Sequence, residues 1–379
     1  MRDTSELLAE AASNFVGPPE FLPRRFLRNG HLQTLVGNFL PRQYVLPEPE
    51  THIIQVNAGG GDAAYGDDTL TAESGTAESG AANRLTQART DVRSRGASYV
   101  LCHCHWQANA SRRPTVLLVH GLEGSTRSQY MLGNSARAWA AGCNVIRMNM
   151  RNCGGTEDLS PTLYHSGLSD DIATVMRTLA AEKGLRAFAL IGYSMGGNLV
   201  LKLAGELGAD GPGYLKAVVG VSPAMDLAVS ADALHNVSNR VYEWKFLVGL
   251  RRRFRRKAAL FPEIYSTEGL ERISTLRQFD DQITARYSGF RGADDYYDRA
   301  SSSHGAPHIG VPTLILHALD DPFIRMLPST RAALLANPRV RLVETSHGGH
   351  CAFLAPAVDY DGYWAEKLLL DFLLPMTKP

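Results

Sequence analysis

Residues 187–208 read AFALIGYSMGGNLVLKLAGELG, and this stretch decides the fold. An apolar run, AFALI, leads into the pentapeptide GYSMG, and a segment with helical spacing follows. The pattern predicts a strand, a sharp turn and a helix, with Ser194 held at the turn. The flanking glycines leave room for close backbone packing, and the start of a helix favours developing negative charge. The turn therefore presents Ser194 as a candidate nucleophile.

Apolar runs of strand length alternate with amphipathic segments on both sides of this turn. The runs are TVLLVH, NVIRMNM, KAVVGVS, VPTLILHA and VRLVET. Such alternation predicts an α/β fold with a mostly parallel central sheet and helices on both faces. The rhythm breaks over residues 224–310, which are rich in Arg, Tyr and Phe and contain no apolar strand-like run. We expect this interruption to be a helical cap inserted into the sheet-forming part of the chain.

A second interruption, residues 58–98, is rich in Gly, Ala, Ser and Thr and contains the near-duplication TAESGTAESG. Because it offers few large apolar side chains to bury, it predicts a flexible low-complexity insert. It lies between two strand-like runs, HIIQV and SYVLCHCHW. The expected organisation is an N-terminal extension wrapping the core (1–57), this insert (58–98), the first part of the core (99–223), the cap (224–310) and the second part of the core (311–379).

The two last strand-like runs are each followed by a residue type that a nucleophilic serine requires. TLILHA is followed by Asp320 and Asp321, and RLVET by SHGGH, which contains His347 and His350. A serine hydroxyl needs a histidine base and an acid that orients it, in the chain order serine, acid, histidine. Asp321 is favoured because it precedes a proline, and His350 because two glycines precede it. Asp320 and His347 remain the alternatives.

Acyl transfer also requires backbone donors for the oxyanion of the tetrahedral intermediate. The glycine-rich sequence HGLEG, residues 120–124, follows the first strong strand-like run. The N–H groups of Leu122 and Met195 are therefore the candidate oxyanion hole. With Ser194, Asp321 and His350 they complete the machinery of a serine hydrolase.

Several segments together resemble the YheT-like branch of the α/β-hydrolases, also called AB-hydrolase family 4. They are RNGHLQT (residues 28–34), HGLEG, MNMRNCGG, YHSGLSDD, GYSMGGN, DDYYDRASS, ALDDPF and GGHCAF. The resemblance implies the triad Ser194, Asp321 and His350. It also implies carboxylesterase or lipase-like activity on acyl esters, in lipid metabolism, without a metal or organic cofactor. Two rival functions are acyl transfer to an alcohol acceptor and non-catalytic binding of lipid or membrane on the same fold.

The formal net charge of +1 creates no global field toward nucleic acid. The strongest local charge feature is RRRFRRK, residues 251–257. It predicts either a solvated face of the cap or contact with an anionic lipid surface. The cap aromatics Tyr242, Trp244, Phe246 and Phe254 are expected to provide apolar walls for an acyl chain.

Five scattered cysteines form no disulfide framework and indicate a reducing compartment. The first fifteen residues resemble neither a signal peptide nor a transmembrane segment, so a cytoplasmic protein is expected. The sequence CHCH, residues 102–105, looks like a metal cluster. In a strand, however, its cysteines and histidines would point to opposite faces, so no metal site is expected there.

Overall fold

The apolar runs of the sequence form an eight-stranded sheet in the computed structural model, which describes residues 20–57, 79–358 and 360–377. The strand order is β1-β2-β4-β3-β5-β6-β7-β8. The neighbours from β4 to β8 pair in parallel, whereas β1 with β2 and β2 with β4 pair antiparallel. The strands are β1 (Glu50–Val56), β2 (Ser98–His105), β3 (Thr115–Val119), β4 (Asn144–Met148), β5 (Phe188–Tyr193), β6 (Leu215–Val221), β7 (Thr313–Ala318) and β8 (Val340–Thr345).

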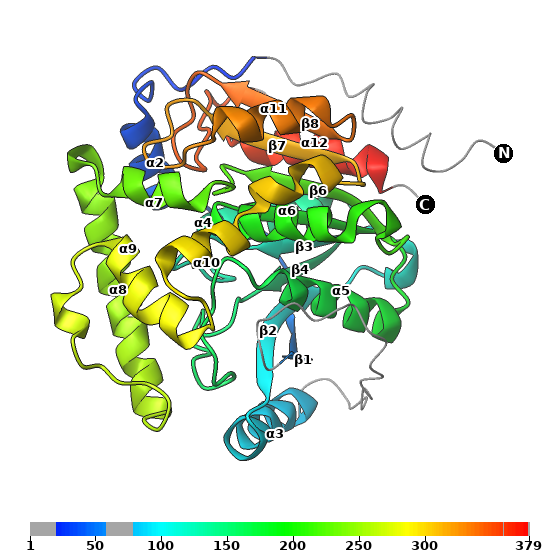
Figure 1. Ribbon diagram of the computed structural model, residues 1–379. Coiled ribbons are helices and arrows are strands. Elements are labelled where there is room, and N and C mark those ends of the chain that lie inside the picture. Colours follow the sequence, from blue (N-terminus) through cyan, green and yellow to red (C-terminus); the bar gives the residue numbers. More distant parts are fainter. Residues whose placement is uncertain (1–19, 58–78, 359, 378–379) are drawn as a thin grey trace.

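Helices cover both faces of this sheet (Figure 1). They are α2 (Gly30–Phe39), α3 (Ser79–Arg95), α4 (Gln129–Ala140), α5 (Ser169–Lys183), α6 (Met195–Leu207), α7 (Leu227–Leu234), α8 (Arg240–Leu260), α9 (Leu276–Phe279), α10 (Ala293–Ala300), α11 (Pro328–Ala336) and α12 (Trp364–Met376). Short helical turns complete the described part: η1 (Ala110–Arg112), η2 (Gly208–Asp210), η3 (Val237–Asn239), η4 (Leu270–Arg272), η5 (Asp280–Ala285) and η6 (Ser302–His308).

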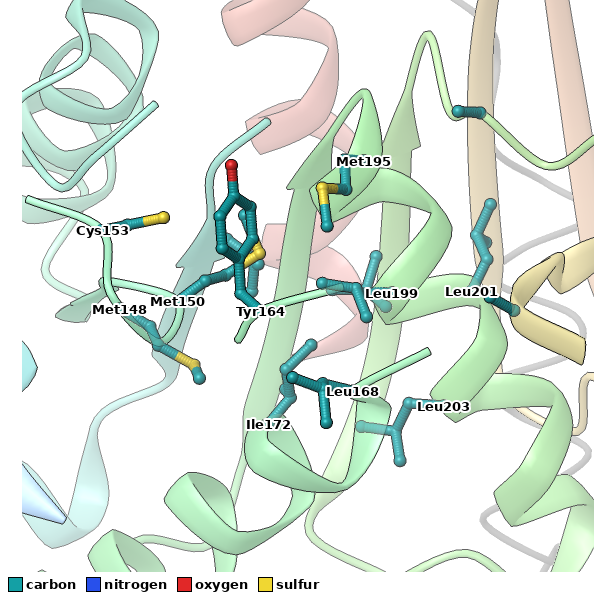
Figure 2. Close-up of a cluster of buried hydrophobic side chains, with 14 of the residues drawn as sticks. Met148, Met150, Cys153, Tyr164, Leu168, Ile172, Met195, Leu199, Leu201 and Leu203 are labelled. Carbon is teal, nitrogen blue, oxygen red and sulfur yellow. The ribbon is translucent and has the colours of Figure 1, made fainter. Parts of the chain in front are cut away.

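The period of two in a strand divides the core into two layers. In β3, Val116 and Leu118 belong to the cluster that α4 and α12 cover, whereas Leu117 and Val119 belong to the cluster that α5 and α6 cover. Figure 2 shows part of this second layer, where Ile172 of α5 lies near leucines of α6. Burial on both faces explains why the central strands are apolar runs without alternation. The expected fold, with its mostly parallel sheet, is confirmed.

The chain between β6 and β7 forms the expected helical cap. All its described elements, from α7 to η6, are helical. Those from α7 to α10 lie together at the left of Figure 1, and η6 leads back across α6. The longest is α8, whose Tyr242, Leu250 and Phe254 are buried at helical spacing. This apolar stripe fixes which face of α8 packs inward.

The expectation for residues 58–98 needs correction. Residues 58–78 lie outside the described part of the chain, but Ser79–Arg95 forms the helix α3. Ala88 and Val92, four residues apart, are both buried, and Arg89 pairs with Asp158 at 2.7 Å. Composition hid this helix because two small apolar side chains, one turn apart, suffice to pack it beside β1.

The CHCH sequence lies in β2, and its side chains alternate as expected. Cys102 and Cys104 are fully buried in one core layer, and burial raises the pKa of both thiols. His105 Nε2 lies on the other face, 3.1 Å from Nη2 of Arg147. Within the described ranges, no group of three or more His, Cys, Asp or Glu side chains is placed to hold a metal ion.

Candidate active site

Ser194 lies between β5 and α6, at the turn that its sequence context predicts. Its backbone is strained, with φ 55° and ψ −116°, a conformation that side-chain-bearing residues rarely adopt. Its N–H donates to the carbonyl of Val221 on β6 at 2.9 Å, and its carbonyl accepts from Asn198 at 3.0 Å. The turn therefore projects the serine side chain from the carboxyl end of the sheet.

The glycines of the GYSMGGN motif are required by close backbone contacts. A Cβ at Gly192 would lie 2.1 Å from the carbonyl oxygen of Gly196, and one at Gly196 would lie 2.4 Å from that of Val119. Both distances are far below van der Waals contact with rigid backbone. The first turn of α6 thus packs directly against the ends of β3 and β5, which fixes where Ser194 stands.

Asp321 and His350 are joined by a hydrogen bond. Asp321 follows β7, and its Oδ2 lies 2.8 Å from Nδ1 of His350, in the loop after β8. The other carboxylate oxygen accepts from the backbone N–H groups of Phe323 and Ile324, at 3.1 and 2.9 Å. The carboxylate is therefore buried, fully bonded and oriented toward the imidazole.

The charges of this pair support each other. Burial alone would raise the pKa of Asp321, but His350 and the two backbone N–H groups outweigh it and hold the pKa below its usual range. Burial alone would lower the pKa of His350, but negative charge on Cys351 and Asp321 outweighs it and raises that pKa. The contribution of Cys351 requires a thiolate; when the thiol is protonated, mainly Asp321 remains. Cys351 Sγ lies 3.6 Å from Nε2 of His350, the nitrogen that faces away from Asp321.

The alternative residues form a pair of their own. Asp320 Oδ2 lies 3.5 Å from Nδ1 of His347, and Asp320 Oδ1 accepts from the N–H of Gly349 at 2.9 Å. The side chain of Asp320 thus supports the backbone just before His350. The geometry separates the two aspartates: one contacts the imidazole of His350, and the other holds its loop.

The loop HGLEG begins beside Ser194. A Cβ on Gly121 would lie 3.1 Å from Cβ of Ser194, and the N–H of Gly121 already donates to the hydroxyl of Tyr130 at 2.9 Å. Leu122, the next residue, lines a cavity together with Ser194 and Met195. The two candidate oxyanion donors therefore flank the same space as the serine.

The cap anchors this loop through Glu123, which has a left-handed backbone at φ 59°. Glu123 Oε1 accepts from Nε of Arg253 on α8 and from the hydroxyl of Tyr164, both at 2.9 Å. A Cβ at Gly249 of α8 would lie 2.3 Å from Oε2 of Glu123, so helix and loop are in close contact. Glu123 had no role predicted from the sequence, and Arg253 was expected only as part of the basic run 251–257.

The RNGHLQT segment lies against the His350 loop, although no role in the site was predicted for it from the sequence. Asn29 caps α2, and Gln33 exchanges hydrogen bonds with the backbone of Leu354, donating at 3.1 Å and accepting at 2.9 Å. Thr34 Oγ accepts from the N–H of His350 at 2.8 Å. The signal in the sequence was the presence of several polar side chains in RNGHLQT, a segment whose last residues form the start of α2.

The match to a known family agrees with this geometry. Residues 114–356, more than half of the chain, match the family model described as the alpha/beta hydrolase fold. This chain belongs to the α/β-hydrolase family.

Within the family, the chain is similar to YheT-like proteins. It is 34% identical over 270 residues to the candidate esterase YheT of Escherichia coli (strain K12), covering 70% of this chain and 78% of that protein. It is 29% identical over 271 residues to phospholipase ABHD3 of Bos taurus, covering 71% and 66%. It is 28% identical over 271 residues to monoacylglycerol lipase of Saccharomyces cerevisiae (strain ATCC 204508 / S288c), covering 69% and 59%. The chain thus spans less than two thirds of the last two proteins.

A cavity of about 110 Å³ lies between the cap and the core of this α/β-hydrolase. Its walls are mostly apolar, from both the cap and the core, and include Leu163, Phe246 and Phe254. Ionisable groups also line it, among them Lys257 and Asp280. Burial lowers the pKa of Lys257 to about 7 and raises the pKa of Asp280 to about 6.

A larger groove of about 810 Å³ opens on the other side of Ser194. It runs between α2 and α8, and His350, Cys351 and Tyr130 line it. Ser194 lines both the cavity and the groove, so it stands where the two meet.

One expectation for the cap needs correction. Trp244 does not wall the cavity: its side chain is 67% exposed, because it lies two residues from Tyr242 and so on the opposite face of α8. In the basic run 251–257, Arg252, Arg255 and Arg256 are exposed, and the other basic side chains are partly or fully buried. Arg255 pairs with Glu271, Arg256 with Glu157 and Arg251 with the carbonyl of Ile273, and Lys257 is buried.

Among the helices that the structure describes, none is both long enough and apolar enough to cross a membrane.

Proposed function

We propose that this chain is a serine hydrolase that cleaves carboxylic (acyl) esters through an acyl-enzyme intermediate. Ser194 is the nucleophile, His350 the general base and Asp321 the acid that orients it. The observation that carries the proposal is the 2.8 Å hydrogen bond from His350 to a buried Asp321, beside a groove that Ser194 and His350 share. The strained backbone of Ser194 supports it further.

The reaction begins when Ser194 Oγ attacks the ester carbonyl carbon and His350 Nε2 takes the hydroxyl proton. The N–H groups of Leu122 and Met195 stabilise the oxyanion of the tetrahedral intermediate. Collapse of that intermediate expels the alcohol, which receives the proton from His350 Nε2. A water molecule, deprotonated by the same nitrogen, then attacks the acyl-enzyme, and Ser194 recovers its proton as the acid leaves.

The cavity and the groove suggest how an ester is placed. The acyl chain enters the apolar cavity, and the alcohol part occupies the wider, more polar groove. A cavity of about 110 Å³ is smaller than the ~150 Å³ that holds a benzene molecule in an engineered protein core. With the cap closed in this way, short acyl chains are the preferred substrates.

The relatives support the reaction class rather than one substrate. Their names describe a candidate esterase, a phospholipase and a monoacylglycerol lipase, which agrees with ester hydrolysis. A cytoplasmic location is part of the proposal, because all five cysteines are free thiols.

The test is turnover of p-nitrophenyl esters of graded acyl length, with glycerolipids alongside, by wild type and Ser194→Ala. Wild type should cleave short esters fastest and react with a fluorophosphonate probe, and Ser194→Ala should do neither. Ser274→Ala, an exposed cap serine, is the matched control and should behave as wild type.

Turnover by Ser194→Ala at the wild-type rate would overturn the assignment of the nucleophile. A folded wild type that binds lipid but cleaves no ester and takes up no probe would favour a non-catalytic lipid-binding role. Products that carry the acyl group on an added alcohol, in preference to water, would make the protein an acyltransferase.

A further inference from the structure

The helix α2 carries an exposed apolar stripe. Leu32, Leu35 and Phe39 lie at positions i, i+3 and i+7, and each is at least 40% exposed. This spacing places all three on one face of the helix. The opposite face, with Gln33 and Thr34, is buried against the His350 loop. A helix whose inner face is polar and whose outer face is apolar reverses the usual pattern for a protein surface.

The cap helix α8 carries a second stripe with the same spacing. Val241, Trp244 and Val248 lie at i, i+3 and i+7, and their exposed fractions run from 44% to 70%. The buried stripe of α8 lies on its other face, so these three side chains have no part in the core. Scattered exposed apolar residues are ordinary on a protein surface, but two ordered stripes are not.

The two stripes lie side by side. The ring of His31 on α2 stacks on that of Tyr242 on α8, with centroids 5.7 Å apart. Further along both helices, Lys245 Nζ of α8 lies 5.2 Å from the ring centre of Phe39 of α2. Figure 1 shows α2 beside the upper end of α8. Between the two helices runs the groove that leads to Ser194.

The charged residues in the two segments that carry the stripes are mostly basic. Residues 21–46, which contain α2, include four arginines and no aspartate or glutamate. Residues 236–252 contain four basic residues and one acid, Glu243, which is buried and bonded to His235. Arg28, Arg240 and Lys245 are exposed. A surface that combines apolar stripes with exposed cations matches an anionic lipid interface in both respects.

We propose that α2 and the first half of α8 dock this protein on the surface of an anionic phospholipid bilayer. Leu32, Leu35, Phe39, Val241, Trp244 and Val248 enter the boundary between head groups and acyl chains, and the flanking cations meet the anionic head groups. Docked in this way, the protein opens its groove toward the bilayer, so that a lipid reaches Ser194 without crossing water. Binding itself does not depend on the chemistry of Ser194.

The experiment measures binding of the full chain to vesicles by cosedimentation, in separate arms with zwitterionic lipid alone and with added anionic lipid. Wild type should bind anionic vesicles more tightly than zwitterionic ones. The double variant Leu32→Ser/Trp244→Ser should bind anionic vesicles at least about tenfold more weakly, because it removes one large apolar side chain from each stripe. Leu335→Ser, which removes a leucine that is 58% exposed on α11, against 46% for Leu32, is the matched control.

Charge and insertion are tested separately. Arg28→Gln and Arg240→Gln should each weaken binding to anionic vesicles about fivefold, without affecting zwitterionic ones. The emission of wild type should shift to shorter wavelength on binding, and a Trp244→Phe variant should lose that shift.

Unchanged vesicle binding by Leu32→Ser/Trp244→Ser would overturn the proposal. So would a wild type that binds no vesicle but forms a dimer that this double variant dissociates, because the stripes would then join two copies of the chain. Leu32→Ser/Trp244→Ser and the control Leu335→Ser should both hydrolyse a soluble short-chain ester as wild type does. Loss of that hydrolysis together with a lower melting temperature would mean that the stripes support the fold instead.

Discussion

The hydroxyl of Thr34 accepts a hydrogen bond from the backbone N–H of His350 at 2.8 Å, across 316 positions of sequence. The same hydroxyl donates to the carbonyl of Gly30 within α2, at 2.7 Å. Thr34 therefore fixes the backbone of the proposed general base, while Asp321 fixes its ring. The N-terminal segment takes part in the site without contributing a group that reacts.

Replacing Thr34 by valine should slow catalysis while leaving substrate binding nearly intact. Valine keeps the shape of threonine but leaves the N–H of His350 without a partner, a loss of about 1–3 kcal/mol. We expect kcat on p-nitrophenyl butyrate to fall about tenfold with little change in KM. Thr34→Ser, which retains the hydroxyl, should restore most of kcat. Equal kcat values for Thr34→Val and wild type would exclude a positioning role.

The two adjacent aspartates should differ sharply in their effect on turnover. Asp321→Asn should lower kcat on the order of 10⁴-fold, because an amide cannot hold the imidazole in the tautomer that accepts a proton at Nε2. Asp320→Asn should have a much milder effect, since the Asp320 carboxylate contacts His347 and the N–H of Gly349. Steady-state kinetics of the two purified variants decide the matter. If Asp320→Asn is the crippling change, the acid is misassigned.

Sequence predicted those parts of the molecule in which one local pattern determines one structure. The strand before Ser194, and the strands before Asp321 and His350, are continuous apolar runs that only a sheet covered on both faces can bury. Because the carboxyl ends of parallel strands meet at one edge, the order of the motifs already brought the three residues together. Their positions in the structure follow this expectation.

Other features depended on contacts that no local pattern specifies. Thr34 and Gln33 have ordinary helical neighbours, and only the fold brings them to the His350 loop. Ala88 and Val92 pack α3 against the sheet, although the composition of that stretch resembles a flexible linker. Trp244 is aromatic like its neighbours, but the register of α8 turns it outward. The aromatic content of the segment could not show which face of α8 would line the cavity.

Asp280, in the cavity wall, should make stability depend on pH. Burial raises its pKa from 3.8 to about 6, although Thr284 and Tyr297 both donate to its oxygens at 2.8 Å. A carboxyl whose pKa is higher in the folded state stabilises the fold while it is protonated. That contribution is complete below about pH 4 and is lost as the pH rises through about 6.

Asp280→Asn keeps a neutral group of the same shape at every pH, and the amide can still accept from Thr284 and donate to Tyr297. Its free energy of unfolding relative to wild type should therefore improve between pH 4 and pH 7, by up to roughly 3 kcal/mol. Urea denaturation of both proteins at the two pH values measures this difference. Asp298→Asn, which changes an exposed carboxylate on α10, is the control and should show little pH-dependent gain. A difference between Asp280→Asn and wild type that is the same at both pH values would mean that Asp280 stays ionised in the folded protein, with its burial offset by the two hydroxyls.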